Sequence, residues 1–405
     1  MRFRRTAAIV KRPLDPVAEF LRTEAGGGFA LLGAAIVALL WVNIGGSGGY
    51  ESLWTTDLSL GVGDAAISQD LRHWVNDGLM VLFFFVISLE IKRELVTGDL
   101  REPRAAALPV IAAIGGVAVP ALLFLALSGG GPASDGWGIP MATDAAFAIA
   151  ALAILGDRVA IGVKLFLVTI AVVDDVIAIG VIAIAYTKEL EIGWLALAFA
   201  GLLGVVAMRR LGAKGPAAFV PLAIFIWIAT LESGVHATIA GVALALLTPA
   251  RPVNGRPVLE QLEDRLHPVS SFVVLPLFAL ANAGVAFGGD ALSDDDGKRV
   301  ALAIVVALVA GKLLGIAGAT VAAVRLRIGD LPEGVGLRSV IGVAALAGIG
   351  FTVSLFIAPL AYSDPVLIDS AKVGILAASL TSAAIGIAVL APGGRHPSRG
   401  RGDLE

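Results

Sequence analysis

Long apolar runs recur along the whole chain and constrain its fold more than any other sequence feature. A helix of about 20 predominantly apolar residues is long enough to cross the hydrocarbon core of a bilayer. Of the 405 residues, 57% are hydrophobic and only 16% are charged. Soluble domains are about 45–50% apolar and about 25% charged. The sequence therefore predicts an all-α integral membrane protein.

Charged residues, glycines and prolines divide the apolar runs into twelve expected transmembrane helices. Their ranges are 27–44, 77–95, 105–127, 137–155, 160–186, 192–208, 216–232, 234–248, 269–287, 300–324, 338–361 and 371–391. The longest segment between spans, 45–76, contains strand-like alternation over 56–63. Either a small external hairpin or an irregular loop would fit this pattern.

The basic residues indicate how the chain is oriented in the membrane. Of the 30 Lys and Arg residues, 24 lie at the two ends and in alternate loops, and four lie in the other loops. Because basic residues collect on the cytoplasmic side, both termini are expected there. We expect a single transporter domain over 1–405, with a cytoplasmic N-terminal segment at 1–26 and a cytoplasmic tail at 392–405.

Composition also excludes several kinds of chemistry. The chain has no cysteine, so it has no disulfide, no thiolate metal site and no cysteine nucleophile. A net charge of −3 and only four histidines argue against a nucleic-acid partner.

Four ionisable residues lie near the middle of expected spans. They are Asp144 in the fourth span, Asp174 and Asp175 in the fifth, and Lys312 in the tenth. Each costs about 2.5–3.5 kcal/mol at the centre of a membrane helix, so such residues persist where they pair, face water or act. A purely structural ion-pair network is the simpler alternative. However, three carboxylates and one ammonium group do not balance, and at least one carboxylate is left for a proton, a cation or a solvated cavity.

The adjacent aspartates suggest an exchange chemistry. Neighbouring residues on a helix point about 100° apart, so one of the pair can meet Lys312 while the other faces a cavity. A carboxyl group in an apolar environment holds a proton more tightly than in water, and carboxylate oxygens also suit hard cations. Competition between H⁺ and a metal ion for one carboxylate is in itself an exchange mechanism.

Two of the expected spans contain features that interrupt helices. The fourth begins with a Gly and Pro and carries the polar pair Thr143 and Asp144, and the eleventh contains glycines and hydroxyl residues over 347–354. Interrupted spans at corresponding positions of two halves indicate a transporter binding site near the bilayer midplane. The candidate halves are the third to fifth and the tenth to twelfth spans, although they share no convincing sequence identity.

Eight sequence blocks carry a resemblance to a known family. They are WVNDGLM (74–80), LEIKREL (89–95), TD (143–144), DD (174–175), SGVHAT (233–238), LPLFALANAG (275–284), GK (311–312) and GIGFT (348–352). With these blocks in order along nearly its whole length, the chain resembles the bacterial NhaA sodium/proton antiporter family. That family has inverted repeats with broken helices.

The resemblance implies a role for each matching residue. Asp175 is the principal cation- and proton-binding carboxylate, and Asp174 is the neighbour that exchanges partners with Lys312. Thr143 and Asp144 are the polar pair at the crossing of two discontinuous helices. Asp144 offsets the positive half-helix ends there, and Lys312 offsets the negative ones. The second discontinuous helix contains Gly350, Phe351 and Thr352.

The resemblance also implies the transport reaction and its setting. Family members expel Na⁺ or Li⁺ against two entering protons, so Asp175 and Asp174 would bind the transported metal ion. No cofactor and no enzymatic activity are expected. The partners are Na⁺, Li⁺, H⁺ and the lipid bilayer of the bacterial inner membrane, and segment 45–76 can mediate a homodimer.

Five further residues match family positions linked to pH response. These positions are Glu90, Glu94, Glu263, His267 and His236. From the residues alone, the Glu90–Glu94 region reads as a solvated helix end, and His236 as a hydrogen-bonded histidine at a helix boundary. The sequence departs from the family pattern at Asp264, where a second histidine is usual, at Glu232 and at Leu313.

Other functions fit parts of the same pattern. A proton- or sodium-coupled symporter of an organic anion is the main alternative, but it would need an arginine or a polar cluster for the substrate. An intramembrane aspartyl protease would use Asp144 with Asp174 or Asp175. That mechanism gives Lys312 no role. A passive channel or a retinal-based pump accounts for the midplane charges less well.

Overall fold

The computed structural model describes residues 15–62, 65–187, 190–213, 215–253, 255, 257–287, 292–332 and 334–392. Residues 1–14 of the expected N-terminal segment and residues 393–405 of the expected tail lie outside these ranges. Helix α1 (Asp15–Leu40) begins inside the segment expected to precede the first span.

The described chain is mostly helical, in agreement with the all-α prediction. Six helices are long and apolar enough to cross a membrane by themselves. Four of them are single elements: α5 (Pro103–Leu127), α7 (Ile161–Ala185), α8 (Ile192–Arg210) and α17 (Pro365–Leu390). The span Thr23–Gly45 comprises most of α1 and the π-helical segment η1 (Trp41–Gly45). The span Asp295–Arg325 joins α13 (Asp295–Val306), η9 (Ala307–Gly311) and α14 (Lys312–Arg325).

Two further helix pairs are long and apolar enough only when each pair is taken together. The 3₁₀ segment η4 (Gly131–Met141) is followed by α6 (Ala145–Leu155) at an angle of 50°. Similarly, α15 (Leu337–Leu346) is followed by α16 (Phe351–Ala361) at 44°. The described residues thus contain six to eight membrane-capable spans, and the expectation of twelve stays a prediction.

The other expected spans fall on shorter or more polar helices. The shorter elements are α2 (Ser47–Trp54), α3 (Leu71–His73), η2 (Trp74–Leu79), α4 (Met80–Val96), η3 (Asp99–Arg101), η5 (Gly156–Arg158), η6 (Pro216–Phe219), α9 (Val220–Glu232), α10 (Thr238–Leu247), α11 (Val258–Val269), η7 (Ser270–Val274) and α12 (Leu275–Asn282). Helix α4 carries most of the expected second span. Segments α11, η7 and α12 follow one another without a break, and η7 and α12 cover the expected ninth span only as far as Asn282.

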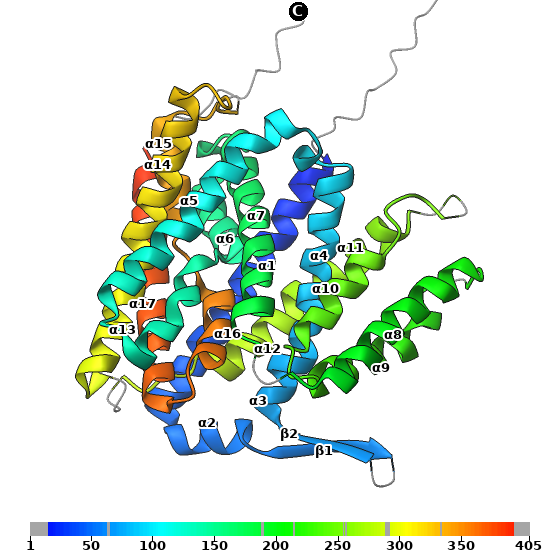
Figure 1. Cartoon of the computed structure of the whole chain (residues 1–405). Helices are drawn as coiled ribbons and strands as arrows, with labels where there is room; N and C mark the ends of the chain where they lie inside the picture. The colour runs from blue at the N-terminus through cyan, green and yellow to red at the C-terminus, as the bar shows by residue number, and fades with distance from the viewer. Residues whose placement is uncertain are drawn as a thin grey trace, which may run out of the picture.

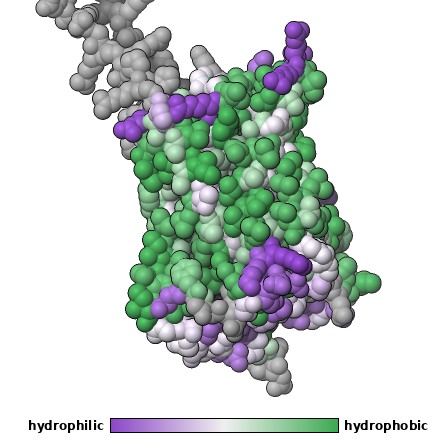
Figure 2. Space-filling model, turned by 90° about the vertical axis from the view of Figure 1, so that its left-hand side faces the viewer, coloured by the Kyte–Doolittle hydropathy of each residue, from purple (hydrophilic) through white to green (hydrophobic). Residues whose placement is uncertain are grey.

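The surface supports burial in lipid rather than in water. Hydrophobic residues cover the middle of the face in Figure 2, while hydrophilic residues gather toward its two ends. Large apolar side chains such as Leu122, Ile154 and Leu380 are more than 60% exposed. A continuous apolar surface of this kind is typical of a protein surrounded by acyl chains.

A two-stranded antiparallel hairpin lies at the end of the molecule opposite both described chain ends (Figure 1). Strand β1 (Asp57–Val62) pairs with β2 (Ala65–Asp70), with Leu60 opposite Ile67. The structure therefore selects the hairpin over the irregular loop. The Trp74 indole N–H donates to the Leu58 carbonyl at 2.8 Å and anchors β1 to the start of η2.

Helices α5 and α14 pack closely because glycines face each other at their contact. A Cβ at Gly115 would collide with the Gly315 carbonyl, and a Cβ at Gly315 would collide with the Gly115 carbonyl. Without a hydrophobic driving force between helices in lipid, small residues that let backbones approach provide much of the association. This contact places Lys312, at the start of α14, beside the centre of the bundle.

Gly315→Ala should destabilise the protein, whereas Gly318→Ala on the same helix should not. Overpacking costs about 1–3 kcal/mol, but a Cβ at Gly318 meets nothing within 4 Å, and alanine favours a helix by up to about 1 kcal/mol over glycine. Thermal unfolding in detergent would measure both variants. Equal melting temperatures would contradict the close α5–α14 contact.

Candidate functional site

The bends of the two helix pairs contact each other in the interior. The first bend covers residues 142–144 and the second covers 347–350. The backbone N–H of Asp144 donates to the carbonyl of Ile349 at 2.6 Å. Helix ends leave backbone N–H and carbonyl groups without intrahelical partners, so both bends need polar side chains nearby.

Asp144 supplies acceptors to the beginnings of two helices. Its Oδ1 accepts from the Phe147 N–H of α6 at 2.9 Å. Its Oδ2 accepts from the Thr352 N–H of α16 at 3.0 Å and also from the Thr352 hydroxyl. The carboxylate, only 4% exposed, thus lies where the positive ends of two helix dipoles converge.

Lys312 lies at the opposite kind of helix end. Its ammonium group is fully buried and donates to the carbonyl of Met141, the last residue of η4. It also forms an ion pair with Asp174 and donates to Thr143 Oγ1 at 3.1 Å. The positive charge therefore offsets a free helix carbonyl as well as a buried carboxylate.

The Thr143 hydroxyl joins the ion pair to the second bend. It lies 2.6 Å from Asp174 Oδ2 and 2.9 Å from the Ala347 carbonyl. Because a hydroxyl has one hydrogen, it donates to only one of these acceptors at a time. Asp174 Oδ1 has no hydrogen-bond partner among the described residues.

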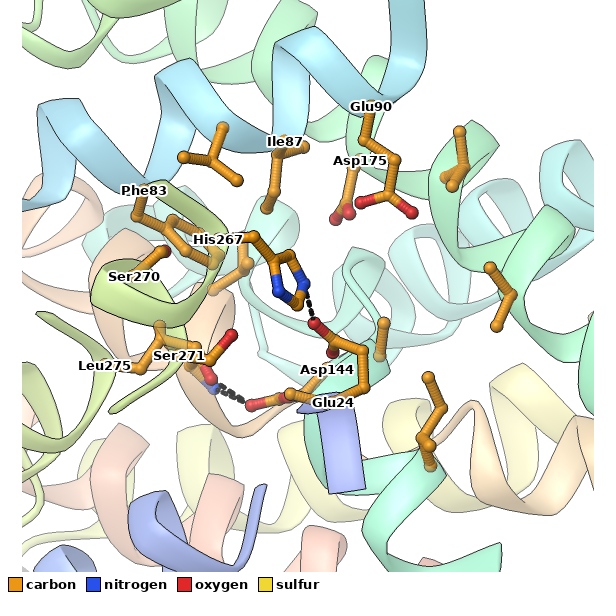
Figure 3. A pocket seen from close by; sticks show the side chains of 18 of the residues that line it. Glu24, Phe83, Ile87, Glu90, Asp144, Asp175, His267, Ser270, Ser271 and Leu275 are labelled. Carbon is orange, nitrogen blue, oxygen red and sulfur yellow. Dashed lines mark hydrogen bonds and ion pairs between the residues drawn. The ribbon is translucent and has the colours of Figure 1, made fainter. Parts of the chain in front are cut away.

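Asp175 faces away from Lys312 and lines a cavity of about 60 Å³. Figure 3 shows Asp175 and Glu90 pointing into this cavity from α7 and α4, with Asp144 also in its wall. Within the described part of the chain, Asp175 makes no hydrogen bond or ion pair, and it remains 9% exposed. The cavity has room for one or two water-sized groups. The two aspartates therefore lie as the 100° spacing on a helix predicts.

Among the pH-response candidates, the structure brings Glu90 and His267 to the cavity. Glu263 instead accepts from Arg93 at 3.0 Å, and Glu94 pairs with Arg93 at the same distance. His236 lies apart from the cavity lining, with its Nε2 2.7 Å from the Tyr186 carbonyl.

The expectation of an ordinary solvated helix end at Glu90–Glu94 was wrong. Arg93 pairs with two carboxylates, and Lys92 donates to the carbonyls of Leu246, in the last turn of α10, and Thr248, directly after it. Tertiary contacts with α10 and α11 therefore order this end of α4, which the local sequence pattern does not reveal.

Glu24 is a site residue that sequence reasoning missed. It was expected in an N-terminal segment outside the membrane, but it lies within α1, is 8% exposed and lines the cavity. It forms a hydrogen-bonded ion pair with His267 (Figure 3). The sequence did hold one indication of this role. Glu24 directly precedes an apolar run, where a charged residue is not required to keep a loop in water.

The surroundings shift the pKa values of two groups on α11. Burial lowers the pKa of His267, but the hydrogen bond and charge of Glu24, with help from Glu90 and Glu263, outweigh it and raise the pKa above its usual value. Burial raises the pKa of Glu263, and Arg93 partly opposes that increase.

Carboxylate oxygens are the cation ligands that the side chains of this site can offer. Among the described residues, no three acidic or histidine side chains form a cluster with the arrangement of metal ligands. Asp175 can provide a carboxylate to Na⁺ or Li⁺, whereas Asp174 is engaged by Lys312. Further oxygen ligands would come from water, hydroxyls or backbone carbonyls, as hard cations prefer.

Comparisons with known proteins show which proteins this chain resembles. A family model described as Na⁺/H⁺ antiporter 1 matches residues 18–390. The Na⁺/H⁺ antiporter NhaA 3 of Frankia alni is 44% identical over 92% of this chain and 88% of its own length. The Na⁺/H⁺ antiporter NhaA of an Acidovorax species is 46% identical over 90% of this chain and 89% of its length. NhaA 2 of Erythrobacter litoralis is 44% identical over 94% of both chains.

Lys312→Ala should destabilise the protein by about 3–5 kcal/mol, because it leaves Asp174 as an uncompensated buried charge. The double variant Lys312→Ala, Asp174→Ala should recover part of the loss. Lys298→Ala is the matched control, since Lys298 is 55% exposed and its ion pair with Asp295 is 3.8 Å long. The free energy of unfolding of the detergent-solubilised protein would be measured for all three variants. An unchanged free energy of unfolding in Lys312→Ala would refute the pairing with Asp174.

Glu24→Gln should lower the pKa of His267. Because the folded-state pKa is raised, the stabilisation from the Glu24–His267 pair is complete below about pH 6.5. It is lost as the pH rises through the folded-state pKa. In the variant this loss should be smaller and should occur at lower pH.

Titration of the imidazole resonances by NMR would measure that shift directly. Glu51→Gln provides a control because Glu51 pairs with Arg72 elsewhere. A His267 titration unaffected by Glu24→Gln would contradict the pair.

Proposed function

Because this chain belongs to the Na⁺/H⁺ antiporter 1 family, we propose that it exchanges Na⁺ for H⁺ across a membrane by competition of the two cations for Asp175. One observation carries the proposal. Of the adjacent aspartates at the centre of the bundle, Asp174 forms an ion pair with Lys312, while Asp175 lines a cavity and forms no ion pair with any residue that the structure describes. Two cations can therefore compete for the same carboxylate.

The exchange follows from the chemistry of that carboxylate. A buried carboxyl group without a counter-ion favours its protonated form. A Na⁺ ion that enters the cavity provides the missing positive charge, so its binding is linked to release of the Asp175 proton. On the other side of the membrane the proton rebinds and the metal ion leaves. Li⁺ is a hard cation of the same charge and should substitute for Na⁺.

In this proposal the exchange is electrogenic, and the ion pair between Asp174 and Lys312 opens when Asp174 turns toward the cation. Two protons then enter for each Na⁺ or Li⁺ expelled. The net movement of one charge inward draws on about 2.3 kcal/mol for each 100 mV of membrane potential.

The two bent helix pairs provide the framework for alternating access. We assign them to the discontinuous spans of an inverted-repeat transporter with about twelve helices, whose sites lie where such spans cross. Both termini would face the cytoplasm of a bacterial cell, with the β1–β2 hairpin outside, where it could pair two copies. The contacts of Asp144 and Lys312 with helix ends support this assignment.

Regulation by pH would act through the cavity edge. His267 and Glu24 form an ion pair there, beside Glu90. As the pH rises, His267 loses its charge and the pair weakens, which changes the electrostatic potential at the entrance to Asp175.

The cavity disfavours the anion symporter. Its charged wall contains Glu24, Glu90, Asp144 and Asp175, with His267 as the one basic side chain in the described lining. An organic carboxylate would meet like charges in a space of about 60 Å³. A small cation suits both the size and the sign of this site.

Asp175→Asn should abolish exchange without unfolding the protein, because the amide neither takes up nor releases a proton and offers no charged oxygen. In everted vesicles with an acid interior, Na⁺ or Li⁺ should restore the fluorescence of a pH-sensitive dye, and K⁺ should not. Asp296→Asn, at an exposed carboxylate 65% accessible to solvent, is the control and should retain exchange.

Exchange retained in correctly inserted Asp175→Asn protein would refute the assignment. A wild-type protein that responds to no cation between pH 6 and 9 would favour the anion symporter instead.

A further inference from the structure

All three tyrosines of the chain are buried and use their hydroxyls to bond backbone groups of other segments. The chain contains 17 phenylalanines but only three tyrosines. Tyr50, Tyr186 and Tyr362 are 1%, 7% and 3% exposed. A buried phenol needs a polar partner that a phenylalanine does not. Two of the three hydroxyls bond the same segment, η4.

Tyr186 joins the end of α7 to the middle of η4. It directly follows the helix that carries both central aspartates. Its hydroxyl accepts from the Gly138 N–H at 3.0 Å and donates to the Asp135 carbonyl at 3.0 Å. Its ring stacks on Trp137 with the ring centroids 6.3 Å apart.

Tyr362, directly after the end of α16, also bonds the backbone of η4. Its hydroxyl donates to the Ala133 carbonyl at 2.8 Å. A Cβ at Gly136 would collide with the Tyr362 hydroxyl, and a Cβ at Gly138 would collide with the Tyr186 hydroxyl. The glycines of η4 thus create the space in which both phenols reach the backbone.

Segment η4 lies on the side of the bend that the cavity does not reach. The described cavity lining includes Thr143, Asp144 and residues of α6, but no residue of η4. The end of η4 is bound at the site itself, since Met141 accepts from Lys312 and the Ile139 carbonyl accepts from the Ser354 hydroxyl at 2.6 Å. A movement of η4 would therefore uncover the site from the face opposite the cavity.

We propose that Tyr186 and Tyr362 are positioning residues for ion exchange, whose hydroxyls hold η4 closed over the face of the site opposite the cavity. This inference rests on the proposed function, because exchange requires that the site open to each side in turn. Release of the two hydroxyls lets η4 move away from α7 and α16 and admits ions from the side of the β1–β2 hairpin.

Removing one hydroxyl should shift the equilibrium of η4 toward the open state roughly 2- to 10-fold, which corresponds to the net contribution of a buried hydrogen bond. The two substitutions act on the same segment, so the double variant should open further than either single one. Tyr→Phe removes only the hydroxyl and keeps the ring packing.

Accessibility of a cysteine on η4 would measure the opening. The chain has no cysteine of its own, so Ala133→Cys, at a side chain 4% exposed, provides a single probe. A membrane-impermeant maleimide would be added to intact cells and, separately, to everted vesicles that contain the full-length protein. Labelling should accelerate in Tyr186→Phe and Tyr362→Phe, and only when the reagent is added from the hairpin side.

Tyr50→Phe is the matched control. The Tyr50 hydroxyl also bonds the backbone, donating to Leu280 at 2.8 Å and accepting from Gly284 at 3.3 Å, but it does not contact η4. A merely structural role would lower the melting temperature in all three variants and leave labelling unchanged. Unchanged labelling in both η4 variants, or an equal increase in Tyr50→Phe, would overturn the proposal. If the wild type showed no exchange, only the proposed function would be overturned. The labelling rate of Ala133→Cys reports the movement of η4 and needs no transported cation.

Discussion

The backbone groups at the two helix bends must be paired inside the protein, and the rest of the site depends on this constraint. Lipid offers no hydrogen bonds, so an unpaired N–H or carbonyl at this depth costs several kcal/mol. Asp144 accepts from the N–H groups of two helices, and Lys312 donates to the final carbonyl of a third segment. The charged side chains at the centre of the bundle thus pair backbone groups that the bends leave without intrahelical partners.

Once Lys312 is present, the remaining charges follow. A buried ammonium group needs a carboxylate, and Asp174 provides one. Its sequence neighbour Asp175 is carried to the same depth on a different face of α7, where it meets the cavity. The carboxylate for which we propose ion exchange is thus placed by helix geometry next to the one that pairs with Lys312.

Sequence reasoning succeeded where one local property decides the structure. The apolar length over 160–186 predicted α7 (Ile161–Ala185) nearly to the residue, and alternation over 56–63 indicated β1 as one of two alternatives. At 137–155 the sequence predicted an interrupted span, but the apolar run revealed neither the 3₁₀ form of η4 nor its beginning at Gly131. It missed Glu24 and the three tyrosine hydroxyls because their partners are distant in sequence, and a contact such as Glu24–His267 leaves no periodic pattern.

The Thr143 hydroxyl has one hydrogen and two acceptors, Asp174 Oδ2 and the Ala347 carbonyl. Whichever acceptor receives it, the other must find a substitute. If Asp174 turns away, the hydrogen is free to rotate to Ala347 and strengthen the link to the end of α15. A change of partner at Asp174 is thereby passed to Ala347, 204 residues beyond Thr143 in sequence, through the rotation of a single O–H bond.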